Sequence, residues 1–124
     1  MCIFAPKTTG MVKAREEVEK FISTFIAKAD IFGVIFVDRD KNNEALKMLG
    51  LTDSASLRLV KEIKVEEYSD TISDSLSYGD MWIFGKDYNG KELYIKVSLG
   101  KFSDSAICVS FHIAQYQLEH PYKQ

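Results

Sequence analysis

Residues 81–100 read MWIFGKDYNGKELYIKVSLG, and this stretch decides the fold. Asn89 and Gly90 separate two runs that are rich in β-branched and aromatic residues. Asn-Gly is the dipeptide that a type I′ turn needs, because both central residues of that turn take positive φ. The stretch therefore predicts a tight antiparallel hairpin.

The turn also predicts the register of the hairpin. With Asn-Gly at the centre, Trp82 lies opposite Val97 and Phe84 lies opposite Ile95, so both aromatic side chains belong to the core face. A further run, 106–113, has the same strand composition. We expect it to complete an antiparallel meander with the helices on one face.

Period-two alternation divides these strands into two faces. The core face takes the apolar set, which is Leu93, Ile95, Val97, Leu99, Ile107, Val109, Phe111 and Ile113. The other face takes the polar set, which is Tyr94, Lys96, Ser98, Cys108, Ser110 and His112.

The preceding part of the chain predicts helices. Apolar residues recur at helical spacing over 12–29, and a short β-branched and aromatic run over 32–37 reads as a buried strand. A second helix over 42–49 ends at a glycine, and a third begins at Thr52 or Asp53. Serine, aspartate and glycine dominate 66–80, which predicts an exposed loop. The fold class is α+β, with an antiparallel meander packed against N-terminal helices.

Composition bounds the class of protein. The chain has 124 residues, 46% of them hydrophobic and 27% charged, which is typical of one soluble domain over residues 1–124. No apolar run approaches the roughly 20 residues of a membrane helix, and the first ten residues lack a signal-peptide core, so we expect a cytoplasmic protein without membrane contact. The net charge of -2 argues against binding bulk DNA. Cys2 and Cys108 lack partners at metal-ligand spacing, and we expect no metal or cofactor.

The polar face carries groups suited to phosphodiester chemistry. His112 can act as acid or base near neutral pH, Lys96 supplies a fixed positive charge, and Tyr94 supplies a proton donor or a platform for a base. The alternative is an ordinary solvated sheet face, which commonly collects the same residue types.

The order and spacing of several segments resemble the MqsR-like toxins of bacterial type II toxin-antitoxin systems. The resemblance runs from about Phe32 to Lys123 and includes Arg39-Asp40-Lys41-Asn42, Ala45-Leu46, Leu49-Gly50, Val65-Glu66-Glu67-Tyr68, Met81-Trp82-Ile83-Phe84-Gly85-Lys86, Tyr94-Ile95-Lys96, Val109-Ser110-Phe111-His112-Ile113-Ala114 and His120-Pro121-Tyr122-Lys123.

The resemblance implies a RelE-like fold and a metal-independent endoribonuclease that cleaves single-stranded messenger RNA. It also implies a cognate antitoxin of the helix-turn-helix type as partner. The family's catalytic tyrosine corresponds to Tyr94. The family's lysine after the Ser-Phe pair is replaced here by His112, and its lysine in the preceding segment falls near Ser69.

Two further positions have open interpretations. Arg39 and Lys41 follow the predicted strand and could contact phosphate, or could pair with neighbouring aspartates. His120, before Pro121, reads as a tail residue that packs on the sheet. The rival function for the whole chain is a non-catalytic domain of the same fold that docks a protein partner. A positive cleft around Tyr94 and His112 favours the enzyme, whereas an apolar or acidic patch there favours the docking domain.

Overall fold

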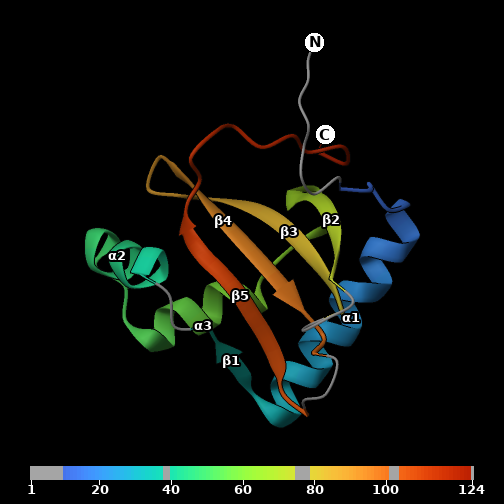
Figure 1. Cartoon of the computed structure of the whole chain (residues 1–124), viewed down its shortest axis with the longest axis horizontal. Helices are drawn as coiled ribbons and strands as arrows, with labels where there is room; N and C mark the ends of the chain where they lie inside the picture. Colours follow the sequence, from blue (N-terminus) through green and yellow to red (C-terminus); the bar gives the residue numbers. More distant parts are fainter. Residues whose placement is uncertain (1–9, 38–39, 75–78, 101–103, 124) are drawn as a thin grey trace.

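The computed structural model describes residues 10–37, 40–74, 79–100 and 104–123. Its elements, in chain order, are α1 (Arg15–Phe32), β1 (Val34–Phe36), α2 (Asp40–Leu49), α3 (Asp53–Lys61), the 3-10 turn η1 (Val65–Glu67), β2 (Tyr68–Asp74), β3 (Gly79–Tyr88), β4 (Lys91–Ser98) and β5 (Ala106–Ile113). Within those residues the fold is α+β, with three α-helices and a five-stranded sheet (Figure 1).

The sheet is mixed, with strand order β1-β5-β4-β3-β2. Strands β3 to β5 form the expected three-stranded antiparallel meander, β2 extends it in antiparallel fashion beside β3, and β1 adds in parallel beside β5 at the other edge. The predicted three-stranded meander is therefore confirmed, and it is part of a larger five-stranded sheet. The parallel strand β1 follows α1 in the chain and pairs with β5, which is the last strand of the meander.

The hairpin forms as its turn chemistry predicts. Asn89 and Gly90 have φ of 51° and 82°, the left-handed values that a type I′ turn requires. Trp82 pairs with Val97 across β3 and β4, as the turn position predicted. The same ladder pairs Phe84 with Ile95.

The main core lies between α1 and one face of the sheet. The apolar stripe of α1 buries Val18, Phe21 and Phe25. The ring of Phe21 stacks on Trp82 with centroids 4.3 Å apart and an interplanar angle of 7°. In Figure 1, α1 and α3 lie behind the sheet, and no described helix crosses the near face. We call this near face the open face, and define it by Ile72, Ile83, Tyr94, Lys96, Ser110 and His112.

The predicted loop over 66–80 is wrong for its first half. Residues 68–74 form β2, which pairs with β3. Tyr68 is fully buried, and its hydroxyl lies 2.7 Å from the Thr71 hydroxyl and 3.0 Å from the Lys13 amide nitrogen that donates to it. Burial raises the pKa of this phenol. The polar residues of β2 favoured a loop in the sequence prediction. Pairing with β3 satisfies the backbone hydrogen bonds of β2 and overrides that preference.

A register shift changes the face of half of β5. Ser110 pairs with Lys96, but Cys108 pairs with Val97, so the ladder shifts by one residue around Val109. Cys108 therefore lies in the main core rather than on the polar face, while Ile107 and Val109 form a second cluster with Met81. The sequence prediction for these three β5 residues was wrong because a bulge exchanges the two faces.

Asn42 fixes α2 against the sheet. Its side-chain oxygen accepts from the Phe111 amide at 2.9 Å, and its side-chain nitrogen donates to the Val37 carbonyl at 2.8 Å. One buried amide thus bridges β5, the end of β1 and the start of α2. Because unpaired buried backbone groups are costly, this bridge defines where α2 sits.

None of the described helices combines the length and the apolar composition needed to cross a lipid bilayer.

Candidate active site

Tyr94 and His112 are direct neighbours across β4 and β5. Their rings stack with centroids 4.9 Å apart and an interplanar angle of 8°. The alternation of side chains along both strands directs Tyr94 and His112 to the open face. Both residues lie in the part of the β4–β5 ladder that the bulge does not shift. The structure therefore brings together two of the three predicted catalytic residues.

A backbone contact selects the tautomer of His112. Its Nδ1 lies 2.9 Å from the carbonyl oxygen of Ile113. A carbonyl oxygen only accepts hydrogen bonds, so in the neutral ring the hydrogen resides on Nδ1 and the lone pair resides on Nε2. This arrangement suits His112 Nε2 to accept a proton from a substrate.

Tyr94 is suited to the opposite role. Burial, followed by the nearby Tyr116 and Asp70 side chains, raises the pKa of Tyr94 from 10.0 to about 12. A phenol is protonated at neutral pH with or without this shift, and it can donate its hydrogen to a more basic oxygen. A protonated Tyr94 beside a proton-accepting His112 places an acid and a base next to each other.

Lys96 lies two residues beyond Tyr94 on the same face, opposite Ser110. Tyr94 and Lys96 line a pocket of about 640 Å³ on the open face. The remaining lining residues are Gly10, Val12, Ser69, Asp70, Ile72, Ile83, Tyr116, Gln117, Leu118 and Glu119. We call this the Tyr94 pocket. Its volume is that of a typical site for a small molecule or nucleotide.

His112 does not line the Tyr94 pocket. It faces a smaller pocket of about 110 Å³ that includes Glu44, Ala45 and Met48 of α2. The stacked ring of Tyr94 thus has the larger pocket on one side and His112 on the other. A substrate that contacts Lys96, Tyr94 and His112 together must extend from the Tyr94 pocket past the edges of the Tyr94 and His112 rings.

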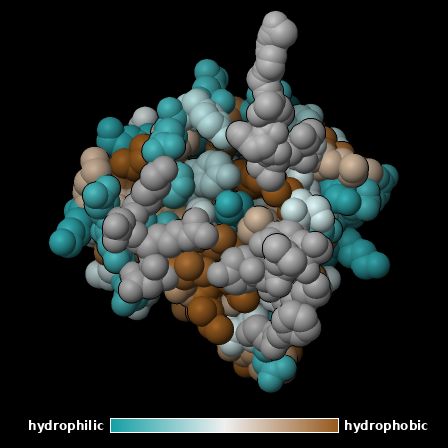
Figure 2. All heavy atoms as spheres, viewed as in Figure 1, coloured by the Kyte–Doolittle hydropathy of each residue, from teal (hydrophilic) through white to brown (hydrophobic). Residues whose placement is uncertain are grey.

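The charge around the site is mixed. Lys96 shares the Tyr94 pocket with two carboxylates, those of Asp70 and Glu119. Figure 2 shows hydrophilic atoms on the same face as apolar ones, and the apolar atoms gather over the lower part of β5. The second cluster, in which Ile107 and Val109 pack against Met81, belongs to this side of the sheet but is buried and contributes little to that surface. The site is therefore not the uniformly positive cleft that would favour a nuclease over a docking domain.

The two predicted phosphate contacts are not placed. Arg39 lies outside the described residues. Lys41 belongs to helix α2, but its side chain also lies outside the described part of the chain. Both remain predictions.

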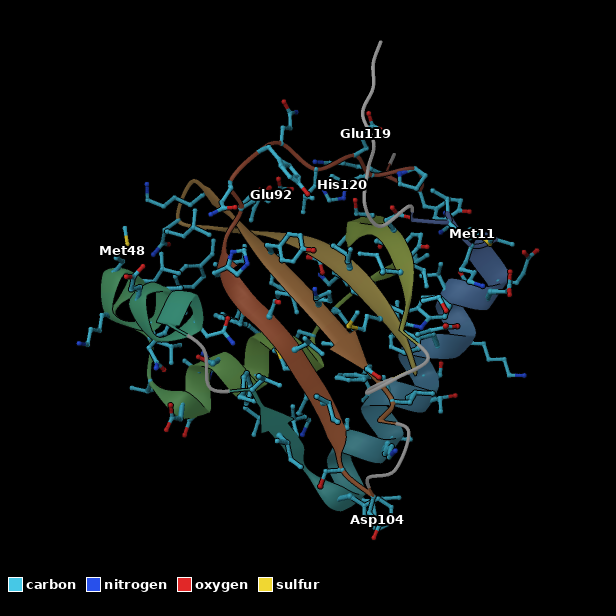
Figure 3. The ribbon with its side chains drawn as sticks, viewed as in Figure 1. Met11, Met48, Glu92, Asp104, Glu119 and His120 are labelled. Atoms are coloured by element: carbon cyan, nitrogen blue, oxygen red, sulfur yellow. The ribbon has the colours of Figure 1, made fainter. Side chains whose placement is uncertain are left out.

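The sequence did not single out the C-terminal wall of the pocket. Tyr116 and Glu119 come from the segment 115–123, which we call the strap. Figure 3 shows Glu92, Glu119 and His120 together where the strap crosses above the sheet. The strap has no helical or period-two pattern, so the sequence pointed to it only through the interpretation of His120 as a tail residue that packs on the sheet and through the resemblance over His120 to Lys123. Asp70 was missed because it lay in the segment expected to be a loop.

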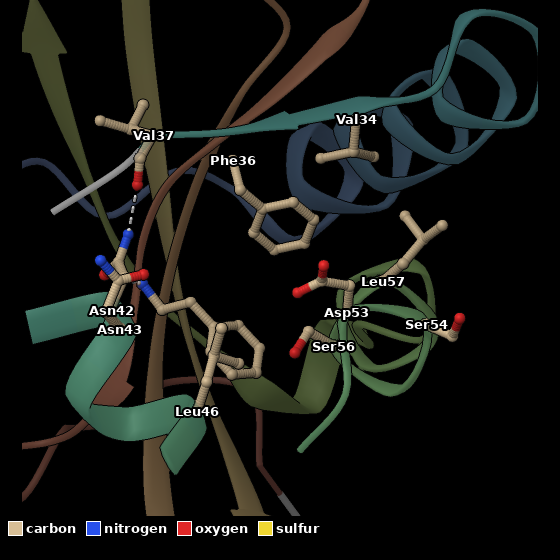
Figure 4. Close-up of a pocket in the computed structure, with 11 residues that line it drawn as sticks. Val34, Phe36, Val37, Asn42, Asn43, Leu46, Asp53, Ser54, Ser56 and Leu57 are labelled. Carbon is tan, nitrogen blue, oxygen red and sulfur yellow. Dashed lines mark hydrogen bonds between the residues drawn. The ribbon is translucent and has the colours of Figure 1, made fainter.

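A second cavity lies on the opposite side of the sheet, between α2, α3 and β1 (Figure 4). It measures about 460 Å³ and is lined mainly by apolar residues such as Phe36, Leu46 and Leu57. It holds none of the predicted catalytic residues. Among the described residues, no group of three or more His, Cys, Asp and Glu side chains is arranged to hold a metal ion.

No protein-family model, curated protein or solved structure matches this chain.

Proposed function

We propose that this protein is a metal-independent endoribonuclease that cleaves single-stranded messenger RNA. The observation that carries the proposal is the stacked pair Tyr94 and His112 beside Lys96 on the open face. These three side chains provide a proton donor, a proton acceptor and a cation on adjacent strands.

The chemistry follows from the protons that each group holds. His112 Nε2 takes the proton of a ribose 2′-hydroxyl, and the 2′-oxygen attacks the adjacent phosphorus. The Lys96 ammonium stabilises the negative charge that develops on the phosphoryl oxygens. The Tyr94 hydroxyl donates its proton to the departing 5′-oxygen. The products are a 2′,3′-cyclic phosphate and a free 5′-hydroxyl, and the cycle closes when solvent returns a proton to Tyr94 and removes one from His112.

The proposal extends to the fold type and the partner. A meander with helices on one face and the site on the other supports a RelE-like fold. In that setting, an antitoxin of the helix-turn-helix type would inhibit the protein by covering Tyr94 and Lys96. The resemblance to MqsR-like toxins supports both statements.

A docking domain without catalysis is the second candidate. The observation in its favour is the pair of carboxylates, Asp70 and Glu119, in the Tyr94 pocket. Carboxylates repel a phosphate backbone and attract basic side chains of a protein partner.

Induced expression in bacteria tests the proposal and separates the two candidates. We expect wild-type protein to arrest growth and degrade total messenger RNA, and Tyr94→Phe and His112→Gln to relieve both effects. Tyr88→Phe makes the same chemical change elsewhere on the sheet and should stay toxic. Normal growth with intact messenger RNA, from folded wild-type protein, would contradict the enzyme and favour the docking domain.

A further inference from the structure

The strap is fastened to the sheet at several points. His120 places Nε2 2.7 Å from Oε2 of Glu92 and Nδ1 3.1 Å from the Glu67 carbonyl oxygen. Farther along, the Tyr122 ring stacks on Tyr68 and its hydroxyl donates to the Lys13 carbonyl. These contacts join the end of the chain to β4, η1 and the start of α1.

Glu92 also closes the first part of the strap into a loop. Its backbone carbonyl accepts from the Ala114 amide at 2.8 Å, and its carboxylate accepts from the Leu118 amide at 3.2 Å. Residues 115–117 therefore lie between two hydrogen bonds to a single residue of β4. This closure limits the positions that Tyr116 can take.

The strap approaches the sheet closely at Gly85, the β3 partner of Tyr94. A Cβ atom at Gly85 would lie 2.6 Å from Glu92 Oε2 and 2.8 Å from both His120 Cε1 and Leu118 Cδ1. The missing side chain leaves the space that these groups occupy. The strap consequently forms a wall directly beside Tyr94.

Tyr116 is the aromatic side chain that this wall presents. It is 65% exposed although it lines the Tyr94 pocket. An aromatic ring held at a pocket by closed backbone, but left open to solvent, is suited to stack on a flat ligand. Lys96 in the same pocket supplies a charge for a phosphate attached to that ligand.

We propose that Tyr116 stacks on the base of a nucleotide that neighbours the cleaved phosphate, and that Glu92 is a positioning residue that holds Tyr116 in place. This inference rests on the proposed ribonuclease function. Stacking tolerates any base, so Tyr116 contributes affinity for single-stranded RNA rather than choice of sequence.

Binding of an uncleavable RNA tests the inference. The probe is a mixed-sequence single-stranded oligonucleotide with 2′-O-methyl sugars, measured by fluorescence anisotropy. We expect Tyr116→Ala to raise Kd about tenfold, and Tyr116→Phe to bind like wild type, because Phe retains the stacking ring. In cleavage assays, Tyr116→Ala should raise KM with little change in kcat. Ile31→Ala is the control, since it removes an exposed apolar side chain of α1 outside the pocket.

A double-mutant cycle tests the role given to Glu92. If Glu92 acts by holding Tyr116, Glu92→Ala weakens binding in the wild-type background but adds little to Tyr116→Ala. Additive effects would overturn the positioning role. RNA binding and cleavage by Tyr116→Ala at wild-type Kd and KM would overturn the inference and leave the ribonuclease proposal standing. Failure of wild-type protein to bind or cleave RNA would overturn both.

Discussion

At the scale of single residues, Tyr94 and His112 differ in where their hydrogens reside. The Ile113 carbonyl places the hydrogen of a neutral His112 ring on Nδ1, and burial raises the pKa of the Tyr94 phenol, so the phenol releases its proton less readily. In the proposed mechanism, the imidazole of His112 on β5 is the base and the Tyr94 phenol on β4 is the acid.

The raised pKa of Tyr94 gives a pH prediction. The pKa is 10.0 for an unperturbed phenol and about 12 in the folded protein, so the folded state holds the proton more tightly. The contribution of protonated Tyr94 to the free energy of unfolding is complete below pH 10, and it is lost as the pH rises to about 12. We expect the free energy of unfolding to fall more steeply across that window in wild type than in Tyr94→Phe, as measured by urea denaturation. Equal slopes for the two proteins would contradict the assignment.

At the scale of elements, the sequence predicted the structures that local turn residues specify, but not those that depend on long-range contacts. The β3–β4 hairpin was predictable because Asn89 and Gly90 specify its turn and the turn specifies its register. Strand β2 was not, because its serine and aspartate residues become a strand only through pairing with β3. The bulge near Val109 was also hidden, since an alternating sequence gives no sign of one extra residue.

The same distinction applies to the site. Tyr94, Lys96 and His112 could be assigned to one face from the period-two alternation alone. All three lie on the same side of the bulge, where β4 and β5 keep the expected register. Tyr116 and Asp70 reach the pocket through the strap and β2, which are positioned by tertiary contacts. Sequence periodicity therefore identified Tyr94 and Lys96 in the Tyr94 pocket, with His112 beside Tyr94, but not the residues that the strap and β2 contribute to it.

The close approach at Gly85 gives a prediction about the strap. Gly85→Ala would place a Cβ where Glu92, His120 and Leu118 now lie, so the strap must shift. We expect the Ala114 and Leu118 amides, which donate to Glu92, to exchange hydrogen about tenfold faster, equivalent to about 1.4 kcal/mol in opening free energy.

Ile83→Val serves as the matched control for that measurement. Ile83 lies on the same strand and face and is buried, so its truncation lowers global stability without touching the strap contacts given above. Wild-type exchange at both amides in folded Gly85→Ala would show that the strap does not depend on this approach.

At the scale of the whole molecule, the two sides of the sheet have separate tasks. One side is covered by α1, α2 and α3 and supplies the main core, which includes the stacked pair Phe21 and Trp82. The other side carries the Tyr94 pocket and the second apolar cluster. With a net charge of -2, the protein lacks a general attraction for polyanions. The RNA binding that we propose would then depend on local contacts such as Lys96 and on stacking by exposed rings.

Cleavage of single-stranded messenger RNA by the purified protein in excess EDTA tests the proposed function most directly. We predict fragments that end in 2′,3′-cyclic phosphate, formed without divalent metal, and a rate at least about 10²-fold lower for folded His112→Ala, as expected for loss of a general base. Intact RNA with folded wild-type protein, cleavage only after divalent metal is added, or wild-type activity in His112→Ala would contradict the proposed mechanism.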